Sequence, residues 1–147
     1  MSLYYDSGVL VKLYVREDRS DEVTRFIARR GESVAVNRLH ELEIRNALRL
    51  KRYREEIDDA QLAASLGMIA ADFAARRLVR RDVDWRVIHD EAERLSAVTA
   101  STVGVRTIDV IHIAAALTQV ATGLVSFDRR QLAAARQSRL AVVELTG

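Results

Sequence analysis

The stretch RTIDVIHIAAALTQVATGLVSFDRRQL, from Arg106 to Leu132, decides the fold. Its apolar residues first recur at helical spacing, then form one short continuous run, and then give way to a second helix-like segment. Gly123 marks the end of the first helix, because glycine commonly follows the last helical residue. The pattern therefore predicts a helix, a buried strand and the start of another helix. Each end of this unit carries an aspartate, Asp109 in the first helical turn and Asp128 just past the strand.

The composition indicates a single domain, residues 1–147, with a sizeable core. Hydrophobic residues make up 49% of the 147 residues, and the chain contains no cysteine, which excludes disulfides and thiolate metal sites. The net charge of +2 excludes a strongly basic nucleic-acid coat protein. No apolar run is long enough to span a bilayer, and the N-terminus does not resemble a secretory leader. We therefore expect a cytoplasmic protein without membrane contact.

Short apolar runs alternate with helical segments along the whole chain. Strands are predicted at residues 3–5, 33–36, 78–83, 124–126 and 140–145, and the longer helices at 22–30, 38–54, 59–77, 84–99 and 129–138. Strands that are separated by helices of this length form βαβ units. The sequence thus predicts an α/β fold, with a central, mostly parallel sheet of four or five strands flanked by helices on both faces.

Two segments share the order strand, aspartate, helix. LYYDSGVL places Asp6 after the first strand, and LVSFDRRQL places Asp128 after the strand that follows Gly123. In open α/β sheets, sites form outside the carboxyl ends of the strands, so we expect both aspartates at one edge of the sheet. The alternative is that each aspartate only caps the helix that follows it. The residues by themselves leave both interpretations open.

The helix predicted over residues 38–54 carries a carboxylate among apolar side chains. At 3.6 residues per turn, one face holds Leu39, Leu42, Leu50 and Tyr53. Glu43 and Asn46 fall in the middle of this face, whereas Glu41 lies on the opposite, solvated side. Burying an unpaired carboxylate costs on the order of several kcal/mol or shifts its pKa, so Glu43 requires a partner. That partner is either an arginine or a metal ion.

The helix that begins after Arg106 presents its acid in a similar way. Its core stripe consists of Val110, Ile113, Leu117 and Ala121. Asp109 borders this stripe, and His112 is expected on the polar rim. The histidines have no spacing that pairs them with other ligands, so we assign His112 no catalytic or metal-binding role. The remaining candidates are the four carboxylates Asp6, Glu43, Asp109 and Asp128.

Four converging carboxylates have a physical use. Without a cation they repel one another and their pKa values rise, whereas a divalent cation removes the repulsion. Ligands that are all oxygen favour magnesium or manganese. One or two such ions can activate a water and stabilise the leaving oxygen in phosphodiester hydrolysis. The neighbouring hydroxyls of Ser7 and Ser126 could orient the carboxylates or the attacking water.

In this order and spacing, YYDSGVLVKLYV, NRLHELEIRNAL, RTIDVIHIAAAL and VSFDRRQLAAA resemble the PIN-domain family, and within it the VapC-like toxins of bacterial toxin–antitoxin pairs. The resemblance implies a three-layer PIN-like α/β/α sandwich and a magnesium- or manganese-dependent endoribonuclease. By motif position it implies three core acidic residues at Asp6, Glu43 and Asp109 and a fourth at Asp128. It also matches Ser126 to the small hydroxyl residue of the family, and Arg106 to a frequent basic position that contacts phosphate or carboxylate.

The resemblance also implies partners: an RNA substrate, a second copy in a homodimer, and a small antitoxin protein that holds the toxin inactive. We expect the antitoxin in an apolar groove formed by Ile44, Leu48 and the helix that begins at Asp59. The alternative is that these positions only pack inside one subunit. The alternative function is a catalytically inactive PIN-fold module that binds RNA or protein. Four retained acids argue against it, because an inert protein has no physical reason to keep mutually repelling charges.

Overall fold

The computed structural model describes residues 2–145, which form two compact units. The first unit contains the chain up to Asp6 together with Asp82–Glu144, and the second contains Ser7–Arg81 and the chain from Leu145. The prediction of a single domain over residues 1–147 stays a prediction. No helix within residues 2–145 is long and apolar enough to cross a membrane.

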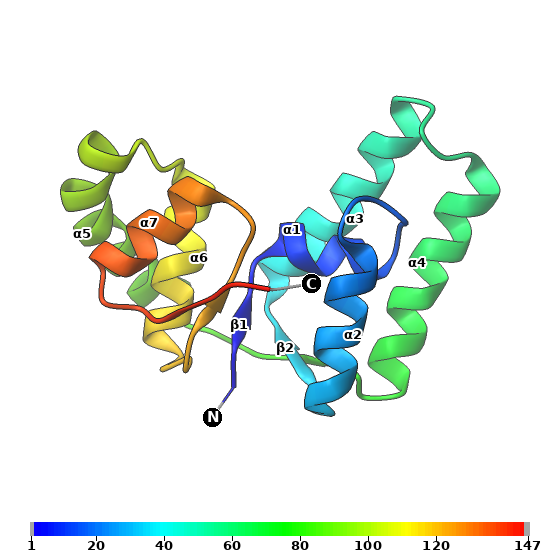
Figure 1. The fold of residues 1–147 in the computed structure, drawn as a ribbon, viewed down its shortest axis with the longest axis horizontal. Coiled ribbons are helices and arrows are strands. Elements are labelled where there is room, and N and C mark those ends of the chain that lie inside the picture. The colour runs from blue at the N-terminus through cyan, green and yellow to red at the C-terminus, as the bar shows by residue number, and fades with distance from the viewer. Residues whose placement is uncertain (1, 146–147) are drawn as a thin grey trace. The chain divides into compact units, whose positions relative to one another are not determined.

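Helices and strands alternate as the sequence predicts (Figure 1). In chain order the elements are β1 (Tyr4–Tyr5), α1 (Ser7–Leu10), the 3-10 helix η1 (Val11–Leu13), α2 (Ser20–Arg30), β2 (Val34–Val36), α3 (Arg38–Tyr53), α4 (Asp59–Ala74), β3 (Leu78–Arg80), α5 (Trp85–Val103), α6 (Thr107–Thr118), β4 (Leu124–Val125), α7 (Arg129–Gln137) and β5 (Val142–Val143).

All described strands pair in parallel, which confirms the predicted α/β class with parallel strands flanked by helices. The pairing differs in detail from one sheet of four or five strands. Hydrogen bonds join β1, β4 and β5, in the order β1-β4-β5, and separately join β2 to β3. Because the strands are only two or three residues long, each strand pair forms few backbone hydrogen bonds.

The core of the first unit lies between its sheet and the helices α5, α6 and α7. Tyr4 of β1 and Leu124 of β4 belong to the same buried cluster as Ile88 and Leu95 of α5 and Ile113 of α6. The three helices gather on one side of β1 and β4 (Figure 1). This packing holds the first turn of α6 and the start of α7 near the carboxyl ends of β1 and β4.

The predicted end of α6 at Gly123 is wrong. The helix ends at Thr118, and Val120 already has a left-handed backbone with a φ of 54°. Gly123 has another use, because a Cβ at this position would lie 3.3 Å from the carbonyl oxygen of Ala141 and 3.3 Å from Cδ2 of Leu3. The glycine therefore permits the close approach of neighbouring chain segments at the start of β4.

In the second unit, α3 buries a different face from the one predicted. His40, Ile44 and Leu48 are buried, whereas Leu42 is 63% exposed and Tyr53 is 83% exposed. The helix α3 contacts α1, η1 and α4, and its buried positions are spaced by four residues, as on one face of a helix. An open antitoxin groove at Ile44 and Leu48 is therefore excluded, and the alternative that these residues pack inside the subunit is confirmed.

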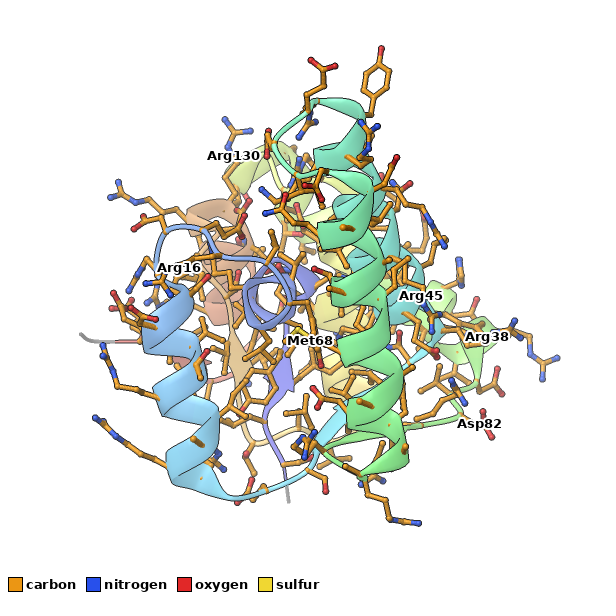
Figure 2. The ribbon with its side chains drawn as sticks, turned by 90° about the vertical axis from the view of Figure 1, so that its right-hand side faces the viewer. Arg16, Arg38, Arg45, Met68, Asp82 and Arg130 are labelled. Atoms are coloured by element: carbon orange, nitrogen blue, oxygen red, sulfur yellow. The ribbon has the colours of Figure 1, made fainter. Side chains whose placement is uncertain are left out.

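Glu41 is also not the plain surface acid that the helical pattern predicts. Its side chain is only 10% exposed and accepts hydrogen bonds from Arg80 at 2.7 and 2.8 Å. Arg45, labelled on α3 in Figure 2, lies 3.4 Å from the same carboxylate. The hydrogen bonds from Arg80 are the main reason that the pKa of Glu41 is lowered. Glu41 thus joins α3 to β3, while Arg38 of the same helix points into solvent (Figure 2).

Candidate acidic site

Three of the four predicted acids lie in the first unit. Asp6 directly follows β1, and its backbone N–H donates to the carbonyl oxygen of Val125 at the end of β4 (2.9 Å). Asp128 follows β4 by three residues, and Asp109 lies in the first turn of α6. Because β1 and β4 pair in parallel, Asp6 and Asp128 leave the sheet at the same edge, as the sequence predicts.

Asp109 is the most buried of these carboxylates, and it is paired with Arg106. The Nε–H of Arg106 donates to Oδ2 of Asp109 (3.1 Å), and Nη2 of Arg106 lies 3.8 Å from Oδ2 of Asp128. Burial raises the pKa of Asp109, the ion pair with Arg106 opposes this change, and the charges of Asp6 and Asp128 add to it. The three aspartates are therefore close enough to repel one another, with one guanidinium among them.

Asp128 has the capping role that the sequence leaves open. One of its carboxylate oxygens, Oδ1, accepts the backbone N–H of Gln131 (2.9 Å) and so caps α7. The hydroxyl of Ser126 contacts the backbone of Asp128 and not its carboxylate. It accepts a hydrogen bond from the backbone N–H of Asp128 (3.0 Å). Oδ2 of Asp128 is the oxygen that faces Arg106.

Two side chains to which the sequence assigned no role lie beside Asp6, and one of them forms a hydrogen bond with it. The Nε2–H of Gln131 donates to Oδ1 of Asp6 (3.1 Å), and Nε2 of His112 lies 4.0 Å from the same oxygen. His112 is 0% exposed, which contradicts its predicted place on the polar rim of α6. Its Nδ1 forms a hydrogen bond of 2.8 Å with the hydroxyl of Tyr4. Counting apolar positions on a helix cannot reveal such a contact, because the partners come from β1.

Gln131 carries an unusual buried atom. The residue is fully buried, and its Oε1 has no hydrogen-bond partner among the described residues. A buried acceptor without a donor costs on the order of 1–3 kcal/mol. The spacing Asp128-x-x-Gln131, which is typical of a helix N-terminus, was the available sequence signal for this residue.

Glu43 and Ser7 belong to the second unit. The hydroxyl of Ser7 donates to Oε1 of Glu43 (2.9 Å). Glu43 is half-buried and borders the buried strip of α3, whereas the sequence placed it in the middle of an apolar face. The convergence of Glu43 with the three aspartates stays a prediction from the sequence.

The oxygen atoms of the acidic site suit a hydrated hard cation, such as magnesium, better than a metal ion that is ligated only by protein side chains. Among residues 2–145, no group of three or more His, Asp or Glu side chains is arranged to hold a metal directly. Magnesium, however, usually keeps several waters and binds through one or two carboxylates. Asp6 and Asp109 can provide these carboxylates. The residues therefore fit a largely hydrated hard cation, and they do not fit a closed, fully protein-ligated site.

No protein-family model and no curated protein matches the sequence. The fold is similar to the crystal structure of FitAcB from Neisseria gonorrhoeae, with a TM-score of 0.64 and 15% sequence identity. The similarity covers 98% of this chain and 97% of that chain. It shows a PIN-like α/β fold, with parallel strands flanked by helices.

Proposed function

We propose that this protein is a metal-dependent endoribonuclease that hydrolyses RNA phosphodiester bonds and acts as the toxin of a toxin–antitoxin pair. The observation that carries the proposal is the group of three aspartates at one edge of a PIN-like fold, with Asp109 buried and its pKa raised. A protein that needed these acids only for folding would gain little from a carboxylate that burial and its neighbours destabilise. The motif resemblance supplies the reaction class.

In this proposal Asp6 and Asp109 hold a magnesium or manganese ion, with Asp128 acting through water. When bound, such an ion supplies a water of lowered pKa and balances the charge of the phosphodiester. Gln131 keeps Asp6 in place by its hydrogen bond to Oδ1, and His112 lies 4.0 Å from the same oxygen. The side chain of Arg106 is 69% exposed, so its guanidinium can turn from Asp109 toward a substrate phosphate.

Glu43 is proposed as the fourth acid on its motif position, with Ser7 orienting its carboxylate. The antitoxin and the second copy of the chain are proposed on the motif resemblance alone. Because Ile44 and Leu48 are buried, neither partner is placed on that strip. The inactive RNA- or protein-binding module remains the second candidate, and the cleavage experiment distinguishes the two.

The direct test is RNA cleavage by the purified protein. We expect fragments from an end-labelled RNA in the presence of Mg²⁺ or Mn²⁺ and none with EDTA, because the aspartates alone provide no activated water. Restoring the metal after EDTA treatment should restore cleavage, which controls for irreversible loss of the fold. If a panel of structured and single-stranded RNAs is left intact with both metals, the inactive module is the better description.

Gln131→Leu tests the support of Asp6. We expect the variant to bind Mn²⁺ about 10- to 100-fold more weakly, because outer-shell partners of metal ligands have effects of this size. The thermal midpoint without metal should stay the same or rise, since the substitution removes the unpaired buried Oε1. Electron paramagnetic resonance of free Mn²⁺ measures the affinity, and Gln137→Leu on an exposed part of α7 is the control. Equal Mn²⁺ affinity of Gln131→Leu and the wild type would contradict the role of Gln131.

A further inference from the structure

A shallow pocket of the first unit lies directly beside Asp128. It has a volume of about 440 Å³ and is lined by Arg106, Phe127, Asp128, Arg129 and Arg130, a group that we call the arginine pocket. Three of its five lining residues are arginines, and only one is acidic. The pocket shares Arg106 and Asp128 with the acidic site, so a ligand bound in it lies next to that site.

Two of the three arginines of the arginine pocket are not neutralised by any described residue. Arg106 is engaged by Asp109, at 3.1 Å, and faces Asp128. Arg129 and Arg130, the latter labelled in Figure 2, are exposed and form no ion pair with any described residue. Some other arginines of this unit are paired on the surface, such as Arg94 with Glu91.

The position of Arg129 and Arg130 also does not serve the stability of α7. They are the first two residues of this helix, where the helix dipole favours acidic side chains and disfavours cations. An anion bound in the pocket would remove this unfavourable arrangement. Arginines that line one pocket suit a phosphate in particular, because each guanidinium group can donate two parallel hydrogen bonds to its oxygens.

The remaining lining residue, Phe127, favours a nucleic-acid phosphate over other anions such as an acidic peptide. Phe127 lines the pocket, and an aromatic ring beside a phosphate-binding group is the combination that binds single-stranded nucleic acid, through base stacking and backbone contact. An acidic peptide would use the arginines but would gain less from the ring. A strand held here also continues naturally toward Asp109 through the shared Arg106.

We infer that the arginine pocket binds a backbone phosphate of single-stranded RNA, adjacent to the phosphodiester that the acidic site cuts. Arg129 and Arg130 hold the phosphate, and Phe127 supports the neighbouring base. The inference rests on the proposed function for its substrate class. It assigns binding residues that can be tested without cleavage.

The test is the salt dependence of RNA binding. A fluorescein-labelled ten-nucleotide oligouridylate is titrated with wild type, Arg129→Gln/Arg130→Gln and Arg86→Gln/Arg139→Gln, with EDTA present to prevent metal-dependent cleavage. The last variant is matched, because it removes two exposed arginines of the same unit that form no ion pair with any described residue, and Arg86 is likewise the second residue of a helix. Fluorescence anisotropy gives the affinity at several salt concentrations.

For Arg129→Gln/Arg130→Gln we expect the slope of log affinity against log salt to fall by about 0.7 for each phosphate that the variant no longer neutralises. The slope of the control variant should stay close to that of the wild type. If both double variants change the slope equally, the effect is one of net charge and the inference is overturned. If Arg129→Gln/Arg130→Gln binds RNA as the wild type does but no longer binds a labelled decaglutamate peptide, the pocket binds an acidic protein and the inference is equally overturned.

Failure of the proposed function has a different signature. Suppose that the wild-type protein cuts no RNA with Mg²⁺ or Mn²⁺, and that RNA binding is weakened only in Arg129→Gln/Arg130→Gln. The arginine pocket is then supported as an RNA-binding site, and the proposed nuclease activity is wrong. Conversely, if the wild-type protein cuts RNA and the two double variants bind RNA equally well, the nuclease activity is supported and the arginine pocket is not an RNA-binding site.

Discussion

Asp109→Asn is expected to reduce metal-dependent RNA cleavage by a factor on the order of 100 to 1,000, while the protein remains folded. The carboxylate is proposed as a direct metal ligand, and loss of several kcal/mol of transition-state stabilisation corresponds to a factor of this size. Asparagine keeps the shape of the side chain and can still accept the hydrogen bond from Arg106. Rates from single-turnover cleavage of an end-labelled RNA give the measurement.

The same variant has a second readout in protein stability. Burial raises the pKa of Asp109 in the folded protein above that in the unfolded chain, so the folded state holds this proton more tightly. The contribution of Asp109 to stability therefore falls as the pH rises through the interval between the two pKa values. Asp109→Asn lacks this decrease, and without metal it should be as stable as the wild type near neutral pH, or more stable.

Asp90→Asn is the matched control, because Asp90 is an exposed acid on α5 of the same unit. Thermal midpoints between pH 3 and pH 8 with EDTA, at pH steps of about one unit, separate the two variants. The proposed mechanism is wrong if Asp109→Asn cleaves RNA as fast as the wild type. The electrostatic description of Asp109 is wrong if its asparagine variant follows the wild-type pH dependence throughout.

Ile113→Ala is expected to lower the free energy of unfolding by about 2–5 kcal/mol, the usual cost of removing a large aliphatic side chain from a packed core. Ile113 is fully buried in the cluster that joins α5, α6 and the sheet of the first unit. It also lies one helical turn after Asp109. Since natural domains are stable by only about 5–15 kcal/mol, a loss of this size is a large part of the total.

Urea denaturation followed by circular dichroism measures this loss. Val98→Ala on α5 is the control, because Val98 is 51% exposed and its truncation should change the free energy of unfolding by no more than about 0.5 kcal/mol. Ile113→Val should fall between the two, at about 0.5–1.5 kcal/mol. A loss below about 1 kcal/mol for Ile113→Ala would show that α6 is not packed tightly behind the acidic site.

The sequence predicted the parts of the fold that local patterns control. Strands and helices alternate where periodicity placed them, and Asp6 and Asp128 leave paired strands at one edge. The pattern was misleading where two apolar strips competed on one helix. On α3 it selected the strip with Leu42 and Tyr53, whereas the neighbouring helices cover the strip with Ile44 and Leu48. Periodicity reports which residues share a face, but only packing decides which face is covered.

In the stretch from Arg106 to Leu132, some features of the acidic site depend on the local sequence and others depend on the tertiary structure. Its sequence alone determined the helix, the strand and the positions of Asp109 and Asp128, because these depend on neighbours within a few residues. The buried contacts of Asp6 were decided only by the tertiary structure. Gln131 reaches Asp6 across 125 residues of chain, and His112 meets Tyr4 across 108. Contacts of this kind form when parallel strands place distant segments side by side, and no local pattern encodes them.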